Sequence, residues 1–171
     1  MLETVISESE ERERMKRKYQ NDMLTIGMGV NIIAFWSSVW MIADIIYADN
    51  PVVDKDLFEV IGMNGVLAIA SVIMLFVTGI QIYIGQSARK EASGKERRSL
   101  YLPLTVLWIL FYTYGLFLDF TNGLQRLENE EQDVLSFCSN LILDSVMFIM
   151  FIQLFWATIK LRKIVGWRKC K

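Results

Sequence analysis

The sequence predicts an all-α fold, an integral membrane four-helix bundle whose helices cross in up-down-up-down order. Apolar residues make up 53% of the 171 residues, and the mean hydropathy is +0.33, which is too apolar for an ordinary soluble domain of this length. Four long apolar stretches each reach the roughly 20 residues that a helix needs to cross hydrocarbon. Positive charge is also confined to alternate connections between these stretches.

Lys and Arg residues place both termini and the middle connection on one side of the predicted membrane. Of the 18, all but Lys55 and Arg126 lie within residues 12–18, 89–98 and 160–171. Cytoplasmic segments accumulate such residues, so these three are expected inside the cell. The net charge of −1 therefore combines a basic inner face with an acidic outer face, and it indicates no nucleic-acid partner. The expected location is a plasma membrane or a bacterial inner membrane, with the lipid bilayer as a partner.

Residues 1–22 predict a charged amphipathic helix in the cytoplasm. Ser7 and Glu10 have the spacing of a capping box at a helix start. Glu13 and Arg17 have the i,i+4 spacing that stabilises an exposed helix. The segment is either a solvated lead into the first span or a docking handle for a cytoplasmic partner.

Turn-forming residues set the limits of the predicted spans. Asp49-Asn50-Pro51 is expected to end the first span, and Thr121-Asn122-Gly123 to end the third. Pro103 falls in the first turn of the third span, where its missing N–H is harmless. The transmembrane domain is expected at 23–160, with spans at about 23–47, 57–85, 100–120 and 134–160, before a basic cytoplasmic tail at 161–171.

Each predicted span carries polar or small residues on one face. In the third span, Thr105, Tyr112 and Asp119 are seven residues apart, which keeps them on one side of a helix in a left-handed bundle. Such faces turn inward in lipid because a polar group in hydrocarbon is costly. They either hold the bundle together through inter-helix hydrogen bonds or line a wet path. The residues expected to bind or pass an ion are Asp144, Asn140, Tyr112, Ser71, Asn64, Ser38 and Asp119.

Asp144 is the strongest single candidate among these residues. It is expected near the bilayer midplane, and no predicted span contains a buried Lys or Arg to pair with it. A carboxyl group there is protonated and donates a hydrogen bond, or is ionised and holds a cation, or alternates between the two as a proton carrier. The remaining alternatives are a purely structural role and an ion pair with a partner chain's Lys or Arg.

The two ends of the predicted bundle carry opposite charges. Acidic residues at the outer end, among them Asp44 and Asp119, either concentrate cations or only reflect the absence of basic residues there. Basic residues at the inner end either anchor the protein or bind anionic lipid headgroups. The expected headgroup ligands are Lys160, Arg162, Lys163, Arg168 and Lys169.

These features favour a channel or carrier subunit that passes a cation or proton. Four spans make a narrow bundle, so a homo-oligomer or a second membrane protein is expected to complete the path. The alternative is a non-transporting membrane partner, such as an assembly, regulatory, immunity or defence component. An enzyme is not expected, because the chain has no His and its cysteines, Cys138 and Cys170, are expected on opposite sides of the membrane. No cofactor or metal is expected either.

Overall fold

The protein is described by a computed structural model, which covers residues 2–47, 55–95, 99–128 and 134–166. This part of the chain is almost entirely α-helical and contains no strand, so the all-α prediction is confirmed for it. The four helices are α1 (Leu2–Tyr47), α2 (Lys55–Ala92), α3 (Tyr101–Glu128) and α4 (Val134–Gly166).

All four helices are long and apolar enough to cross a membrane, as expected of a multi-pass membrane protein. Hydropathy alone places the membrane-crossing segments within the longer helices, at Ser9–Val39, Ala68–Ala92, Tyr101–Thr121 and Phe137–Gly166. Apolar side chains stay exposed along these segments, for example Val72, Leu75 and Phe76, which are each about two-thirds exposed. In water such a surface would be unfavourable, whereas lipid tails cover it at no cost.

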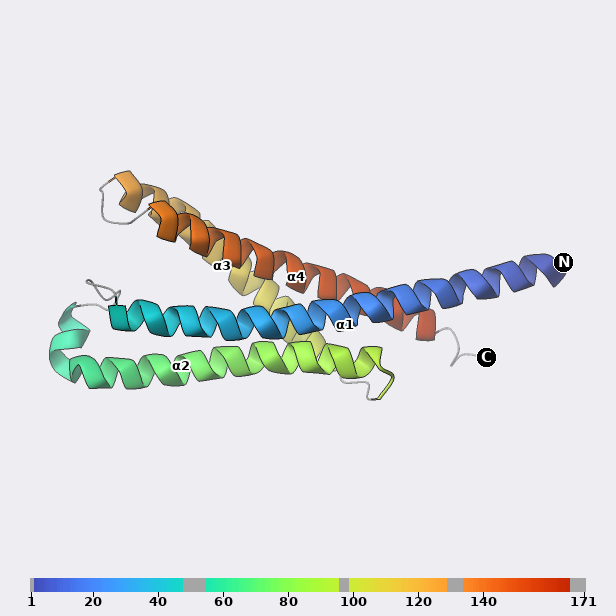
Figure 1. Ribbon diagram of the computed structural model, residues 1–171, viewed down its shortest axis with the longest axis horizontal. Helices are drawn as coiled ribbons and strands as arrows, with labels where there is room; N and C mark the ends of the chain where they lie inside the picture. Colours follow the sequence, from blue (N-terminus) through green and yellow to red (C-terminus); the bar gives the residue numbers. More distant parts are fainter. Residues whose placement is uncertain (1, 48–54, 96–98, 129–133, 167–171) are drawn as a thin grey trace.

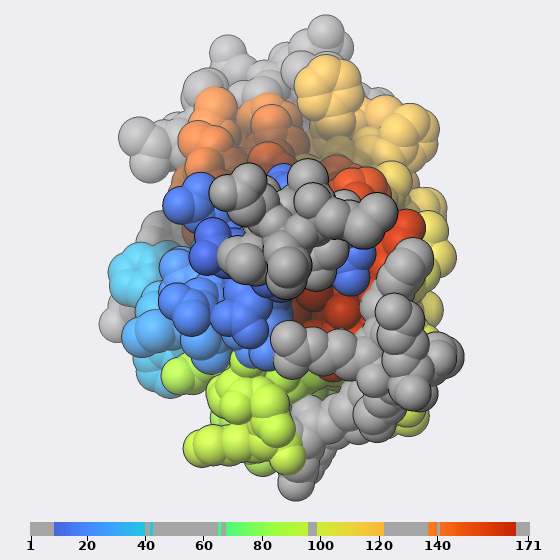
Figure 2. Space-filling model, turned by 90° about the vertical axis from the view of Figure 1, so that its right-hand side faces the viewer, coloured from blue at the N-terminus to red at the C-terminus, as the bar shows by residue number. Residues whose placement is uncertain are grey.

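The helices form two hairpins, α1–α2 and α3–α4, in which the paired helices run in opposite directions (Figure 1). Within the first hairpin, Gly27 lies against Gly85, whereas Ser38, further along α1, contacts Thr78, which comes earlier on α2. The hairpins meet mainly through α1 and α4, because α2 and α3 touch each other only narrowly. Figure 2, a view from the end where α2 and α4 finish, shows α1 (blue) between α2 (green) and α4 (red).

Four helix limits differ from those predicted. α1 is continuous from Leu2, so Ser7 lies inside the helix rather than capping its start. α3 continues through Thr121-Asn122-Gly123 to Glu128, because these turn-forming residues are outweighed by helix formation on both sides. α2 extends to Ala92 and α4 to Gly166, beyond the expected span ends at Gly85 and Lys160. The place of Pro103 in the first turn of α3 is as predicted, whereas Asp49-Asn50-Pro51, expected to end the first span, lies outside the described residues.

Two glycines allow α1 and α2 to approach each other closely. A Cβ atom at Gly85 would lie 2.6 Å from the carbonyl oxygen of Gly27, and one at Gly27 would lie 2.8 Å from the carbonyl oxygen of Gly85. Both distances are shorter than van der Waals contact, so neither position accepts a side chain unless the helices move apart. Small residues at such a crossing are typical of helix packing in membranes.

The buried core occupies one half of the bundle. Every described residue that is buried lies within 23–34, 81–92, 101–112 or 147–161, the half in which α2 and α4 end and α3 begins. We call this the basic end, because Arg89, Lys90, Lys160, Arg162 and Lys163 lie there. Towards the opposite end none of the described residues is buried, and in Figure 1 the two hairpins diverge. The described part of the bundle is therefore packed most tightly at the basic end.

Candidate functional site

Asp144 and Asp119, two acidic residues predicted separately, lie together between α4 and α3. The Asp119 carboxyl group lies within electrostatic range of the Asp144 carboxyl group. Asp144 is half-buried, whereas Asp119 is exposed at the loosely packed end of the bundle. We call these residues the acid pair. Two facing carboxylates repel each other in a medium of low dielectric constant, and a proton or a cation between them would relieve that repulsion.

The register of the α3–α4 hairpin explains why the two acids meet. Tyr112 on α3 stacks on Phe151 of α4, with ring centroids 5.8 Å apart. Seven residues further along α3 is Asp119, and seven residues back along α4 is Asp144. The two helices are antiparallel. Residues seven positions forward on α3 and seven positions back on α4 from one contact therefore meet in the next contact along the same interface. The polar stripe predicted on the third span therefore faces α4.

Tyr112 connects the acid pair to the core. The Gln81 side chain of α2 donates a hydrogen bond from Nε2 to the Tyr112 hydroxyl oxygen at 3.0 Å, and both residues are buried. The Tyr112 hydroxyl also lies within electrostatic range of Asp144. This hydrogen bond lies within the narrow contact between α2 and α3. Gln81 was not predicted as a site residue, although its position three residues after Thr78 puts it near the predicted polar face of the second span.

The other predicted ion-path residues do not join this group. The Ser38 hydroxyl contacts the Thr78 hydroxyl at 2.5 Å and donates to the carbonyl oxygen of Ala34 at 2.7 Å, so it joins α1 to α2. Ser71 is exposed on α2. Asn64 and Asn140 are helical, but their side chains lie outside the described part of the structure. The structure therefore brings together Asp144, Asp119 and Tyr112 out of the seven predicted residues.

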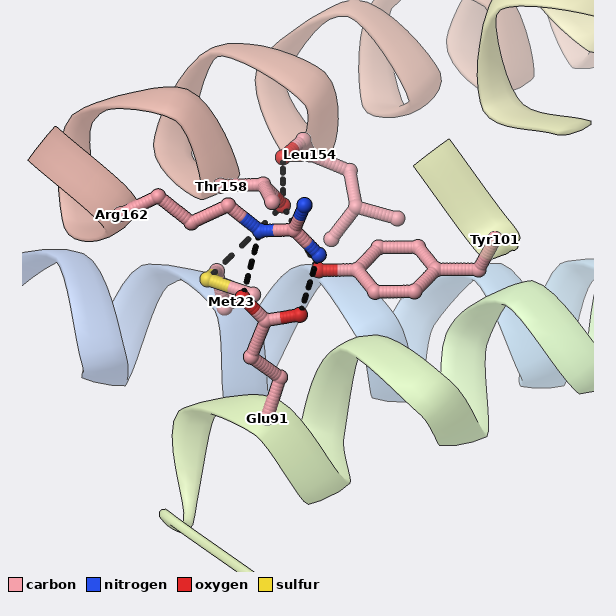
Figure 3. Close-up of polar contacts among 6 residues, drawn as sticks. All are labelled: Met23, Glu91, Tyr101, Leu154, Thr158 and Arg162. Carbon is pink, nitrogen blue, oxygen red and sulfur yellow. Dashed lines mark hydrogen bonds and ion pairs between the residues drawn. The ribbon is translucent and has the colours of Figure 1, made fainter. Parts of the chain in front are cut away.

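A second polar cluster closes the basic end (Figure 3). The Arg162 guanidinium of α4 donates from Nε and Nη2 to the two carboxylate oxygens of Glu91 on α2, both at 2.7 Å. The Glu91 side chain is 9% exposed and that of Arg162 is 20% exposed. A bidentate pair of this kind is among the stronger polar interactions in proteins. It joins the C-terminal ends of α2 and α4, which belong to different hairpins.

Tyr101 and Thr158 also belong to this cluster. We call the four residues Glu91, Tyr101, Thr158 and Arg162 the clasp. The Arg162 guanidinium carbon lies 5.7 Å from the centre of the Tyr101 ring, close enough for a cation–π interaction. The Tyr101 hydroxyl donates to the Thr158 hydroxyl oxygen at 3.3 Å. The Thr158 hydroxyl lies 2.8 Å from the carbonyl oxygen of Leu154 and can donate a hydrogen bond to it. The clasp thus unites α2, α3 and α4.

The predicted lipid-headgroup residues have different surroundings. Arg162 is engaged with Glu91, so its charge is already balanced within the chain. The Lys160 ammonium lies 4.8 Å from the centre of the exposed Trp156 ring, an arrangement suited to the membrane surface. Lys163 is exposed, and Arg168 and Lys169 lie outside the described residues. Headgroup binding by Lys160 and Lys163 stays a prediction.

No protein-family model matches the chain, and neither a curated protein nor a solved structure is significantly similar to it. Within the described ranges, no group of three or more acidic, Cys or His side chains is arranged to hold a metal ion. Function is therefore inferred from the two polar clusters and the packing around them.

Proposed function

We propose that this chain is a subunit of a cation or proton channel or carrier, and that the acid pair is its ion-binding site. The four helices cross the membrane in up-down-up-down order. The basic end and both termini face the cytoplasm, because Lys and Arg accumulate on that side. The membrane is a plasma membrane or a bacterial inner membrane, and the working unit is a homo-oligomer.

The meeting of Asp119 and Asp144 is the observation that carries this proposal. A single membrane acid is often structural, but two carboxyl groups that face each other gain little stability from each other when both are ionised. A proton or a cation between them removes the repulsion. A site that is stabilised by such a ligand and open towards one side can take up and release it.

The packing supports a path that enters from the outer side. Asp119 is exposed where the hairpins diverge, whereas Tyr112 and Gln81 lie further in and are buried. Beyond them the clasp holds the basic end together. This arrangement suits a state in which the acid pair communicates with the outer side and the cytoplasmic side is closed.

One observation favours a second candidate function, that of a non-transporting membrane partner. α1 extends well beyond the buried core at its N-terminal end, and residues 9–15 are all exposed. Glu13 and Arg17 form an ion pair of 3.7 Å on this extension, as predicted. A long charged helix of this kind offers a surface for a cytoplasmic protein. In that case the membrane helices would serve as an anchor and would conduct nothing.

Ion flux in liposomes that contain the purified protein tests the proposal. Proton and cation flux would be compared for the wild type, Asp144→Asn and Asp22→Asn, at acid and neutral pH. Asp22→Asn is a matched control because it removes the same charge from the basic end of α1, away from the acid pair. We expect Asp144→Asn to reduce flux at least tenfold and Asp22→Asn to leave it unchanged. Equal flux in all three would remove the acid pair from the path.

A further inference from the structure

An exposed glutamine lies within the membrane-crossing part of α4. Gln153 falls inside the segment Phe137–Gly166 and is exposed. Lys160, the first basic residue of α4, is seven residues away, or about 10 Å along a helix. The Gln153 amide is too short to reach water across that distance. It also forms no hydrogen bond with another described residue.

None of the described residues completes the hydrogen bonding of an amide group in that position. It carries two N–H donors and one carbonyl acceptor. Lipid tails can satisfy none of them, and polar groups without partners are costly in hydrocarbon. A hydrogen-bonding group from outside the chain is therefore required at this depth.

The residues around Gln153 form a continuous seam along α4. Its members are separated alternately by four and three residues, the spacing at which two helices interlock in a left-handed coiled coil. Ile142, Ile149 and Trp156 are 62%, 51% and 58% exposed. The buried side of α4, with Met147, Phe151 and Leu154, points in another direction. The α4 seam consists of Ile142, Val146, Ile149, Gln153 and Trp156.

We infer that a second copy of this chain packs on the α4 seam, with Gln153 of each copy hydrogen-bonded to Gln153 of the other. All copies insert into a membrane in the same orientation, so a two-fold axis along the membrane normal places identical residues at the same depth. An amide is both a donor and an acceptor, so it is complementary to itself across such an axis. A single polar residue in an apolar heptad seam also fixes the register of the two helices.

The end of the seam is compatible with this symmetry. Lys160 continues the four-and-three spacing after Trp156, and two copies would bring their ammonium groups near each other. Lys160 lies over the ring of Trp156 in its own chain and close to the membrane surface, where water and lipid phosphate screen its charge. The seam therefore ends where the polar region of the membrane begins.

This inference identifies the surface of the proposed homo-oligomer but does not depend on ion flux. It rests only on α4 crossing the membrane. A protein that conducts nothing can still form the dimer, and a protein that conducts can prove to be monomeric. Association of two copies is measured without any ion flux, so a negative result for the dimer can be told apart from a negative result for transport.

Energy transfer between labelled copies in liposomes measures the association. The full chain, with Cys138 replaced by Ser, would be labelled at Cys170 and studied over a range of protein-to-lipid ratios. We expect Gln153→Leu to raise the dissociation constant of the dimer about tenfold, consistent with two inter-helix hydrogen bonds. Gln153→Asn keeps the amide and should remain closer to the wild type. The matched control Gln86→Leu removes an exposed glutamine from α2 and should behave as the wild type.

Disulfide crosslinking locates the contact. In a chain with Cys138→Ser and Cys170→Ser, Ile149→Cys on the seam should crosslink to a second copy under oxidation. Ile159→Cys, which is exposed on another side of α4, should not. The inference is overturned if the wild type stays monomeric at every ratio, if Gln153→Leu associates as tightly as the wild type, or if Ile159→Cys crosslinks more readily. Crosslinking of Ile149→Cys to a different protein in cell membranes, in place of a second copy, would also overturn it.

Discussion

Arg162 and Glu91 form a bidentate ion pair between the ends of α4 and α2, although 71 residues separate them in the sequence. This pair is the main polar link between the two hairpins at the basic end. Both side chains are mostly buried, so each supplies a counter-charge that solvent cannot supply there. The pair lies at the same end of the bundle as the buried apolar core and adds a polar link to it.

Removal of one partner of this ion pair should destabilise the fold. Glu91→Gln leaves the Arg162 guanidinium part-buried without its counter-charge, and we expect the free energy of unfolding to fall by about 2–3 kcal/mol. The measurement is chemical unfolding in detergent, followed by circular dichroism. Glu13→Gln, which breaks the exposed pair with Arg17, is the matched control and should cost about 0.5 kcal/mol or less.

A charge-reversed double variant distinguishes the contribution of the ion pair to stability from that of the neighbouring residues. Glu91→Arg combined with Arg162→Glu restores opposite charges and should recover part of the lost stability. If Glu91→Gln is no more harmful than Glu13→Gln, the pair does not hold the hairpins together.

Substitution at Gly85 should force α1 and α2 apart. Gly85→Ala places a Cβ atom against the Gly27 carbonyl oxygen, so we expect a loss of about 1–3 kcal/mol in the free energy of unfolding. Gly79→Ala is the matched control on the same helix, because nothing lies within 4 Å of its added Cβ atom. It should be neutral or slightly stabilising, since Ala favours helix more than Gly does. Equal effects of the two variants would contradict the close crossing.

The acid pair should hold a proton or a cation when the bundle is folded in a membrane. If it shares a proton, infrared spectra of the wild type in lipid should contain a protonated carboxyl band that is lost in Asp119→Asn and in Asp144→Asn. If it holds a cation, the band is absent, and cations should protect the wild type but neither variant against thermal unfolding. A wild type with neither property would show that the two carboxyl groups do not act as a site.

The proposed orientation can be tested with engineered cysteines. Lys95 at the basic end and Thr121 at the opposite end are both exposed. In a chain without its native cysteines, a membrane-impermeant thiol reagent added outside intact cells should label Thr121→Cys. It should label Lys95→Cys only after the membrane is permeabilised. The reverse pattern would invert the protein and place the acid pair towards the cytoplasm.

The sequence predicted four long apolar helices because hydropathy is a local property of the chain. It also singled out Asp119, Tyr112 and Asp144, but as separate residues on separate helices. Their meeting depends on the register of α3 against α4, which is set by packing contacts such as Tyr112 on Phe151. No local pattern in one helix carries that information.

Glu91 was missed for a related reason. The apolar pattern of the second span weakens after Gly85, so Glu91 was expected in a solvated connection. In the structure α2 continues to Ala92, and the carboxylate meets an arginine from the far end of the chain. The turn signal at Thr121-Asn122-Gly123 also predicted too early a helix end, because helix formation in α3 outweighed it.

Proton and cation flux by the purified wild type in liposomes tests the central claim most directly. Flux would be recorded under an imposed membrane potential and compared with liposomes without protein and with the double variant Asp119→Asn, Asp144→Asn. The account predicts flux well above the protein-free level for the wild type and a return to that level for the double variant. A folded wild type that conducts no more than empty liposomes would contradict the transport proposal and favour a non-transporting membrane partner.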